Sequence, residues 1–184
     1  MIPPSDPSQS PAHPHNGDDL RRATARGGWR RRRLSLALAA AVVAADQLSK
    51  SWAAAVLAAG SPRPLLPGLL ELTFTTNTGA AFSLFTGSTA ALAIISLMVA
   101  TLVLVLILRS AERSMPLTRQ LALGFLLGGA VGNGIDRWRL GAVIDFLALV
   151  PVSFPVFNLA DVAINLAVAC FAIELVRPPQ RGDG

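Results

Sequence analysis

The sequence has few of the residues on which many active sites depend. It contains two histidines, His13 and His15, and a single cysteine, Cys170. Both histidines precede the apolar part of the chain, so we expect no histidine metal site, Ser-His-Asp triad or Cys-His pair within it. Cys170 has apolar neighbours, among which a thiol is unreactive. The sequence therefore predicts a function that uses neither a metal nor another cofactor.

Charged residues are also scarce. They make up 15% of the 184 residues, against 52% hydrophobic residues, whereas soluble domains usually carry about 25% charged residues. The segment 89–108 has no charge and is long enough to cross about 30 Å of hydrocarbon. Three further segments, 34–57, 118–138 and 157–176, have a similar length and are interrupted by a few polar residues. We expect an all-α membrane protein with four transmembrane helices.

The arginines predict how these spans are oriented. Seven of them lie between residues 21 and 33, directly before the first span. The connection between the second and third spans adds Arg109, Arg113 and Arg119, and the tail adds Arg177 and Arg181. By the positive-inside rule all these segments are cytoplasmic, so both termini lie inside the cell and two loops lie on the outer face. Residues 1–33 should form a disordered, basic cytoplasmic arm and residues 177–184 a cytoplasmic tail. Nucleic-acid binding by the arm is a weaker interpretation, because no aromatic-rich recognition module accompanies it.

The first span carries two charges, Asp46 and Lys50, within the motif DQLSK. Their i, i+4 spacing puts them on one helix face, where they can neutralise each other. The pair either fixes helix packing or lines a functional site. The basic residues followed by a short apolar run also resemble a signal peptide. Against that interpretation, the apolar character resumes after Lys50 as SWAAAVLAA, which gives a full span.

The third span combines small and polar residues. It has two overlapping GxxxG motifs, which predict close packing against a neighbouring helix. Their glycines are Gly124, Gly128 and Gly132. Asn133 and Arg137 share a face of the last turn, because they are four residues apart. Asp136 lies in the same turn, and its simplest role, together with Arg139, is to cap the helix and anchor it at the membrane interface.

The two outer loops have the pattern of β-structure. Residues 70–75 alternate between apolar and polar side chains, the period of a half-exposed strand, and residues 77–79 (NTG) follow as a turn. The second loop has β-prone residues interrupted by Pro151 and Pro155, which predicts short strands. We therefore expect a small β-structured platform on the outer face. Asp145 lies within it between two apolar residues, an unusual place for a solvated charge.

The fourth span begins with polar residues that share one helix face. Asn158, Asp161 and Asn165 are spaced i, i+3 and i+7, although an aspartate in the middle of a membrane costs about 2.5–3.5 kcal/mol. The loop between Asp145 and Asp161 is long enough to bring the two carboxylates together. In a shielded site such a pair does not ionise at both groups, so one can act as base and the other as acid. Activation of a water against a peptide carbonyl, the chemistry of aspartic proteases, is one function that this spacing supports.

Four segments resemble the signature motifs of the prolipoprotein signal peptidases, also called signal peptidase II. They read DQLSK, TTNTGAAFS, GGAVGNGIDRW…GAVIDF and FPVFNLADVAIN, and they fall in the family's order within residues 34–176. The resemblance implies an integral-membrane aspartic endopeptidase whose catalytic pair is Asp145, in VIDF, and Asp161, in FNLAD. Asp136, in GNGIDR, is not a member of the pair in this mapping. The family's supporting or substrate-binding positions correspond to Asp46, Asn77, Asn133, Arg137 and Asn158.

The resemblance also implies a substrate and a location. The family removes the signal peptide of bacterial prolipoproteins and cuts just before a cysteine that already carries diacylglycerol. The expected partners are this prolipoprotein and membrane lipid, with no nucleic acid. We expect a monomeric, multi-pass protein of the bacterial plasma (inner) membrane with its active site towards the outer face.

Two other functions compete with this interpretation. A Ser-Lys peptidase would use Ser49 and Lys50, but adjacent residues on a helix point about 100° apart. A small transporter or channel would have polar residues distributed through the depth of the membrane. Here Asn133, Asp145 and Asp161 gather towards the outer end of the spans, which favours an enzyme that acts at one leaflet.

Overall fold

The computed structural model of the chain describes residues 17–79, 89–109 and 115–176, with side chains from residue 33 onward. These residues form four helices and a three-stranded antiparallel sheet. The helices are α1 (Gly17–Val56), α2 (Thr89–Arg109), α3 (Leu117–Leu140) and α4 (Leu159–Val176), and the strands are β1 (Arg63–Leu66), β2 (Leu70–Asn77) and β3 (Val143–Leu149). The protein is thus mostly helical with a small sheet, as the sequence predicts.

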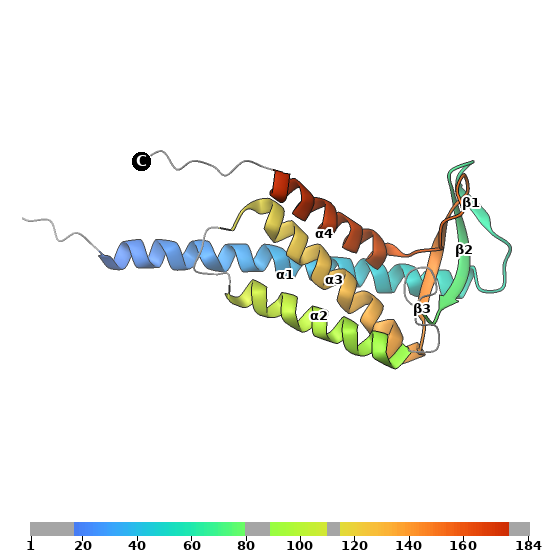
Figure 1. Cartoon of the computed structure of the whole chain (residues 1–184), viewed down its shortest axis with the longest axis horizontal. Helices are drawn as coiled ribbons and strands as arrows, with labels where there is room; N and C mark the ends of the chain where they lie inside the picture. Colours follow the sequence, from blue (N-terminus) through green and yellow to red (C-terminus); the bar gives the residue numbers. More distant parts are fainter. Residues whose placement is uncertain (1–16, 80–88, 110–114, 177–184) are drawn as a thin grey trace, which may run out of the picture.

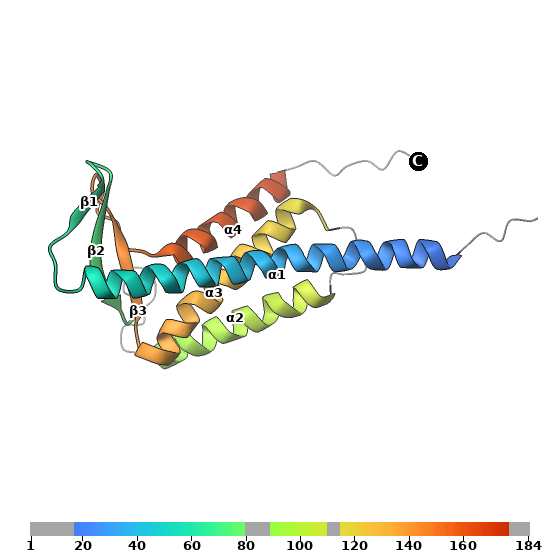
Figure 2. The ribbon, with the colours of Figure 1, turned by 180° about the vertical axis from the view of Figure 1, so that it is seen from behind.

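The helices run alongside one another, and the sheet lies across one end of them (Figure 1, Figure 2). α3 is the central helix, because it packs against α1, α2 and α4. The start of α1 and the end of α4 lie at the end of the bundle away from the sheet (Figure 1). The polar residues near the end of α1, the end of α3 and the start of α4 therefore meet beside the sheet.

Glycines allow α3 to approach α1 closely. A Cβ atom on Gly128 would lie 2.6 Å from the Cβ of Val42, and a Cβ on Gly132 would lie 2.6 Å from Oδ2 of Asp46. The same close approach occurs at Gly124. A side chain does not fit at these distances, so the prediction that the GxxxG motifs pack against a neighbouring helix is confirmed.

Strands β2 and β3 come from the two segments for which the sequence predicts β-structure, whereas β1 lies before the first of these segments and is not part of that prediction. β2 is the central strand and pairs antiparallel with β1 on one side and with β3 on the other. The second segment forms one continuous strand, β3, rather than several short ones. Pro151 and Pro155 come after that strand, and Phe157 then returns to form a bridge with Leu147.

An apolar core holds the sheet against α1. Phe146 and Leu147 of β3 pack with Ala53 and Leu57 at the end of α1, and all four are buried. Partly buried side chains of β2, of the segment before α4 and of the first residue of α4 complete this core: Leu70, Leu72, Phe74, Phe157 and Leu159. The core places β3, and with it Asp145, beside the ends of the helices.

Two helices have the character of membrane spans. Among the residues that the structure describes, α2 and α4 are long and apolar enough to cross a membrane. Their large apolar side chains point outward, for example Met98 and Leu102 on α2 and Val168 on α4. All four predicted segments are helical, and among the described helices length and composition identify α2 and α4 as candidate spans.

Two helices begin two or more residues away from the expected position. α1 begins at Gly17 rather than at residue 34, so residues 17–33, which we expected to be disordered, are helical. Seven of the residues in this segment are arginines, which have high helix propensity, and the segment extends an existing helix, so it needs no new nucleus. α4 begins at Leu159 rather than at residue 157. The expected cytoplasmic tail, 177–184, and residues 1–16 of the expected arm lie outside the described residues.

Candidate active site

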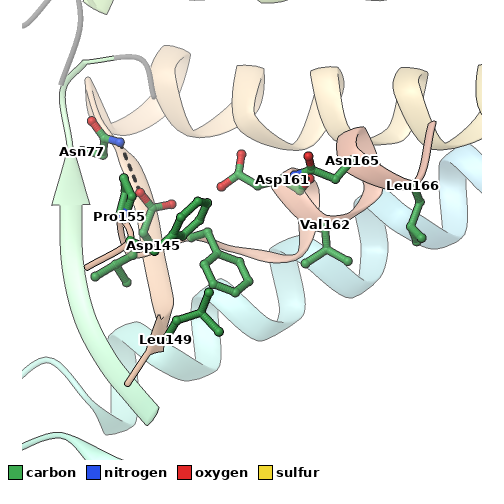
Figure 3. Close-up of a pocket in the computed structure, with 11 residues that line it drawn as sticks. Asn77, Asp145, Leu149, Pro155, Asp161, Val162, Asn165 and Leu166 are labelled. Carbon is green, nitrogen blue, oxygen red and sulfur yellow. Dashed lines mark hydrogen bonds between the residues drawn. The ribbon is translucent and has the colours of Figure 1, made fainter. Parts of the chain in front are cut away.

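Two aspartates from different elements meet at the sheet end of the helices. Asp145 lies on β3, and Asp161 lies in the first turn of α4. Figure 3 shows both side chains on the same cavity, one reaching it from the strand and the other from the helix. The structure therefore brings together the two carboxylates that the sequence predicts as a pair.

Asp145 is almost completely buried, with 2% of its surface exposed. Nδ2 of Asn158 donates a hydrogen bond to its Oδ1 at 2.6 Å, and Nδ2 of Asn77 donates to its Oδ2 at 3.3 Å. Burial, followed by the negative charge of Asp161, raises the pKa of Asp145 to about 6, although the two hydrogen bonds and the charge of Lys50 oppose this rise. The carboxyl group can therefore exchange a proton near neutral pH.

The register of the sheet brings Asn77 to Asp145. Thr75 of β2 pairs with Asp145 of β3, and Asn77 pairs with Val143. Residues two apart on a strand point to the same face, so Asn77 and Asp145 are diagonal neighbours on one face of the sheet. Oδ1 of Asn77 also accepts a hydrogen bond from the backbone N–H of Gly79 at 2.9 Å. This contact forms an Asx turn, in agreement with the turn predicted for NTG.

Asp161 is held at the start of α4 by reciprocal hydrogen bonds. The backbone N–H of Asp161 donates to Oδ1 of Asn158 at 2.9 Å, and the backbone N–H of Asn158 donates to Oδ2 of Asp161 at 3.2 Å. The pattern is that of a capping box, with Asn158 at the N-cap and the acidic residue three positions later. Asp161 is partly exposed, unlike Asp145. Its carboxylate is therefore held in place and remains accessible to water.

Asn133 of α3 connects the surroundings of the two carboxylates. Its Nδ2 donates to Oδ1 of Asp161 at 2.8 Å, and its Oδ1 accepts a hydrogen bond from Nδ2 of Asn158 at 3.1 Å. Nδ2 of Asn158 also contacts Asp145, so the two buried amides form a bridge between the aspartates.

Behind this bridge, Lys50 of α1 forms ion pairs with two buried aspartates. Its Nζ lies 2.8 Å from Oδ2 of Asp46, which confirms the predicted i, i+4 pair, and 2.9 Å from Oδ2 of Asp136. Asp136 is therefore not the interfacial anchor that we expected. It lies on the face of α3 that packs against α1, it is buried, and its Oδ2 accepts a hydrogen bond from the backbone N–H of Ile144 at 3.2 Å.

Asp46 also supports the start of α4. Its Oδ1 accepts a hydrogen bond from the backbone N–H of Ala160 at 3.0 Å, one of the N–H groups in the first turn that have no partner within the helix. Ser49 donates to the backbone carbonyl of Asp46 at 2.9 Å, while Lys50 faces carboxylates. The pair that a Ser-Lys peptidase would need is therefore not formed by these two residues. Lys50 was missed as a residue of the site, although the DQLSK motif contains it.

Arg137 reaches over the site from α3. Its guanidinium donates to the backbone carbonyls of Gly79 and Asn133, each at 3.4 Å. Its Nε is buried and has no hydrogen-bond partner among the described residues. This guanidinium therefore has a donor left over beside the two carboxylates.

A cavity of about 470 Å³ opens beside the aspartate pair. Asn77, Asp145 and Asp161 line it together with Asn165, which is exposed and donates to the backbone carbonyl of Asp161 at 2.9 Å. The rest of the wall is apolar: Leu149, Phe154, Pro155, Val156, Phe157, Val162 and Leu166. In the part of the chain that the structure describes, no three His, Cys, Asp or Glu side chains gather as a metal site would require. The cavity thus offers acid–base groups on one side and an apolar surface on the other.

A helical protein with apolar outer faces and a carboxylate pair at a partly apolar cavity has the features of a membrane enzyme. Two solved structures, both described as bacterial membrane enzymes, share its fold. One has a TM-score of 0.71 and 28% identity, and the match covers 82% of this chain and 93% of the other. The second has a TM-score of 0.67 and 29% identity, with 78% and 92% covered.

Sequence comparison identifies the family. Residues 38–177 match the family described as signal peptidase (SPase) II. The lipoprotein signal peptidase of Parasynechococcus marenigrum (strain WH8102) is 54% identical over 149 residues, which cover 81% of this chain and 92% of the relative. That of Gloeobacter violaceus (strain ATCC 29082 / PCC 7421) is 46% identical over 139 residues, covering 76% and 79%. The chain belongs to the signal peptidase II family and is a membrane peptidase of the aspartic type, which confirms the resemblance of its four motifs.

Proposed function

We propose that the protein hydrolyses diacylglyceryl-modified bacterial prolipoproteins just before the lipidated cysteine, and that Asp145 and Asp161 are its catalytic pair. Membership of the signal peptidase II family supports the reaction. One observation carries the choice of the pair. The two carboxylates reach the same cavity from β3 and α4, and their surroundings differ (Figure 3).

The different surroundings give the two aspartates different roles. Asp161 is partly exposed, and both its oxygens accept hydrogen bonds, so it acts as the base that takes a proton from water. Asp145 is buried and has a raised pKa, so it acts as the acid. The water oxygen bonds to the peptide carbonyl carbon as Asp161 takes one of its protons and Asp145 gives its proton to the carbonyl oxygen. The C–N bond then breaks, the leaving amine takes the proton from Asp161, and the re-forming carboxyl group returns a proton to Asp145.

The other polar residues hold the pair and the substrate. Asn133 and Asn158 orient the two carboxylates, and Asn77 donates to Asp145. Asp46 secures the first turn of α4. Arg137 donates to the backbone carbonyls of Asn133 and Gly79, which holds its positive charge near the two carboxylates.

The shape of the site suits a lipid-linked peptide. The apolar wall of the cavity offers contact to hydrophobic parts of the substrate. The diacylglyceryl group anchors the scissile bond at the level of the lipid headgroups, and the signal helix packs alongside the enzyme helices. The sheet lies across the same end and clamps the residues around the cut.

In this proposal all four helices span the bacterial plasma (inner) membrane, and the protein acts as a monomer. The sheet and the aspartate pair lie at the outer face, and both termini lie in the cytoplasm. The positive-inside rule supports this orientation, because the arginine-rich start of α1 lies at the end of the bundle away from the sheet (Figure 1).

Cleavage of a diacylglyceryl-modified prolipoprotein by the full-length protein in detergent or liposomes tests the proposal. Asp145→Asn and Asp161→Asn keep the size of the side chain but remove its proton transfer. Each is expected to lower kcat by about 10²–10⁴-fold, the usual contribution of acid–base catalysis. Glu71→Gln is the matched control, because it neutralises a carboxylate of β2 that does not line the cavity.

Cleavage near the wild-type rate by either aspartate variant would exclude the pair. A transporter or channel, whose polar residues line a transport path and catalyse no reaction, would then be the better interpretation. A substrate-binding measurement on the inactive variants completes the test, since they should still bind the prolipoprotein.

A further inference from the structure

Lys50 does not line the cavity, yet it contacts the amide that binds Asp161. We propose that Lys50 is a positioning residue for the reaction, because by donating to Oδ1 of Asn133 it determines which end of that amide faces Asp161. The inference rests on the proposed catalytic role of Asp161.

The hydrogen bonds of Lys50 leave it no alternative arrangement. Its Nζ lies 2.8 Å from Oδ2 of Asp46, 2.9 Å from Oδ2 of Asp136 and 3.0 Å from Oδ1 of Asn133. An ammonium group has three N–H donors and no acceptor, so all three donors are used. With 2% of its surface exposed, Lys50 has no access to bulk water as a substitute partner. The ammonium must therefore face the oxygen of the Asn133 amide and not its nitrogen.

This contact sets the direction of the next hydrogen bond. An asparagine amide fits its site in two orientations related by a 180° turn, with oxygen and nitrogen exchanged. With Oδ1 of Asn133 held by Lys50, its Nδ2 donates to Oδ1 of Asp161 at 2.8 Å. In the turned orientation, an oxygen would face the carboxylate of Asp161 and an NH₂ group would face the ammonium. Both contacts would be repulsive in a buried site, where unpaired polar groups are costly.

Asn158 holds Asn133 less firmly than Lys50 does. The orientation of the Asn158 amide is set by the backbone N–H of Asp161, which donates to Oδ1 of Asn158 at 2.9 Å. The two hydrogens of its Nδ2 are shared among three acceptors, Asp145, Asn133 and the carbonyl of Ile144, at 2.6, 3.1 and 3.3 Å. A charge-assisted bond from Lys50 is stronger than such a shared contact. Asn133 is thus the amide of the bridge whose orientation depends on a side-chain cation.

The test compares Lys50→Gln with Lys50→Met, each combined with Asp136→Asn so that one negative charge is removed with the positive one. Gln and Met have equal length and no charge, but only Gln can donate a hydrogen bond to Asn133. With a diacylglyceryl-modified prolipoprotein as substrate, we expect kcat of the Gln form to exceed that of the Met form by about fivefold, the effect of one hydrogen bond. KM should be similar in the two forms, because the bond acts on the base and not on substrate binding. Glu174→Gln is the control, since it breaks the Arg119–Glu174 ion pair between α3 and α4 far from the site and should keep the wild-type kcat.

Equal kcat values for the Gln and Met forms would overturn the inference, because the cation would then serve helix packing alone. Failure of both forms to fold, measured by thermal unfolding in detergent, would overturn it for the same reason. Asp161→Asn is assayed in the same series. If it is inactive while the Gln and Met forms are equal, only the role of Lys50 is rejected, whereas wild-type cleavage by Asp161→Asn would reject the proposed function itself.

Discussion

At the scale of single residues, the two aspartates of the pair differ in their exposure to water. Asp145 is buried on β3, and burial together with the charge of Asp161 raises its pKa to about 6. A group that must be protonated to act as acid loses its proton as the pH rises. In the proposed mechanism, kcat therefore falls as the pH rises through the pKa of Asp145.

Asn77 offers a test of this assignment. Asn77→Ala removes a hydrogen bond to the ionised form of Asp145, which raises the pKa of Asp145 further. The proton is then retained to higher pH, so the alkaline fall of kcat should move upward by about 0.5–1 on the pH scale. Thr76→Ala, at an exposed neighbour on β2, should leave the profile unchanged. A profile of Asn77→Ala that stays in place or moves to lower pH would show that Asp145 is not the acid.

At the scale of elements, α3 joins the two sides of the site. Its Gly128 and Gly132 face α1, and its Gly129 faces Ile164 of α4, so α3 has neighbouring helices within close reach on two sides. This double approach is what allows Asn133 to contact a lysine of α1 and an aspartate of α4 at once.

Gly128→Val should separate α1 from α3. A Cβ atom at Gly128 would lie 2.6 Å from the Cβ of Val42, so the two helices must move apart to accept it. We expect a loss of about 1–3 kcal/mol in the free energy of unfolding, the usual effect of overpacking, and a lower kcat. Thermal or denaturant unfolding in detergent measures the first effect. Gly60→Ala is the control, because the nearest atom to its Cβ would be at 3.8 Å. An unchanged stability of Gly128→Val would contradict the close approach of the two helices.

At the scale of the whole molecule, the polar site and the arginine-rich start of α1 lie at opposite ends. The aspartate pair and the sheet share one end of the bundle, while the arginine-rich start of α1 lies at the other (Figure 1, Figure 2). In the proposed function, the enzyme therefore meets its substrate at one membrane surface. The proposed orientation puts that surface outside the cell.

Cysteine labelling in intact spheroplasts can test this orientation. Cys170 is the single cysteine of the chain, so Cys170→Ser gives a cysteine-free background. Leu66→Cys, at the sheet end, is 52% exposed, and Leu175→Cys, at the end of α4, is 88% exposed. A membrane-impermeant maleimide should label position 66 in intact spheroplasts and position 175 only after lysis. The reverse labelling pattern would show that the protein has the opposite orientation in the membrane.

Several features of the protein follow from local spacing in its sequence. The Asp46–Lys50 ion pair, the glycine motifs of α3 and the alternating strand at residues 70–75 were all predicted, because helix and strand geometry alone decides which side chains share a face. The family resemblance rests on short motifs of the same kind and is confirmed by the comparisons. Spacing also indicated that Asp145 and Asp161 are able to meet, since a loop of sufficient length connects them.

Other features exist only because distant segments meet. The hydrogen bond from Lys50 to Asn133 joins residues 83 positions apart, and the ion pair of Lys50 with Asp136 depends on the same packing of α1 against α3. No local pattern predicts either contact, and for that reason Asp136 was expected at the membrane interface instead of in the buried ion pair. The chain's spacing determined which residues are able to face one another within each element. The packing of α3 between α1 and α4 decided which of them share a hydrogen bond, because a buried charge or amide is stable only where that packing supplies its partner.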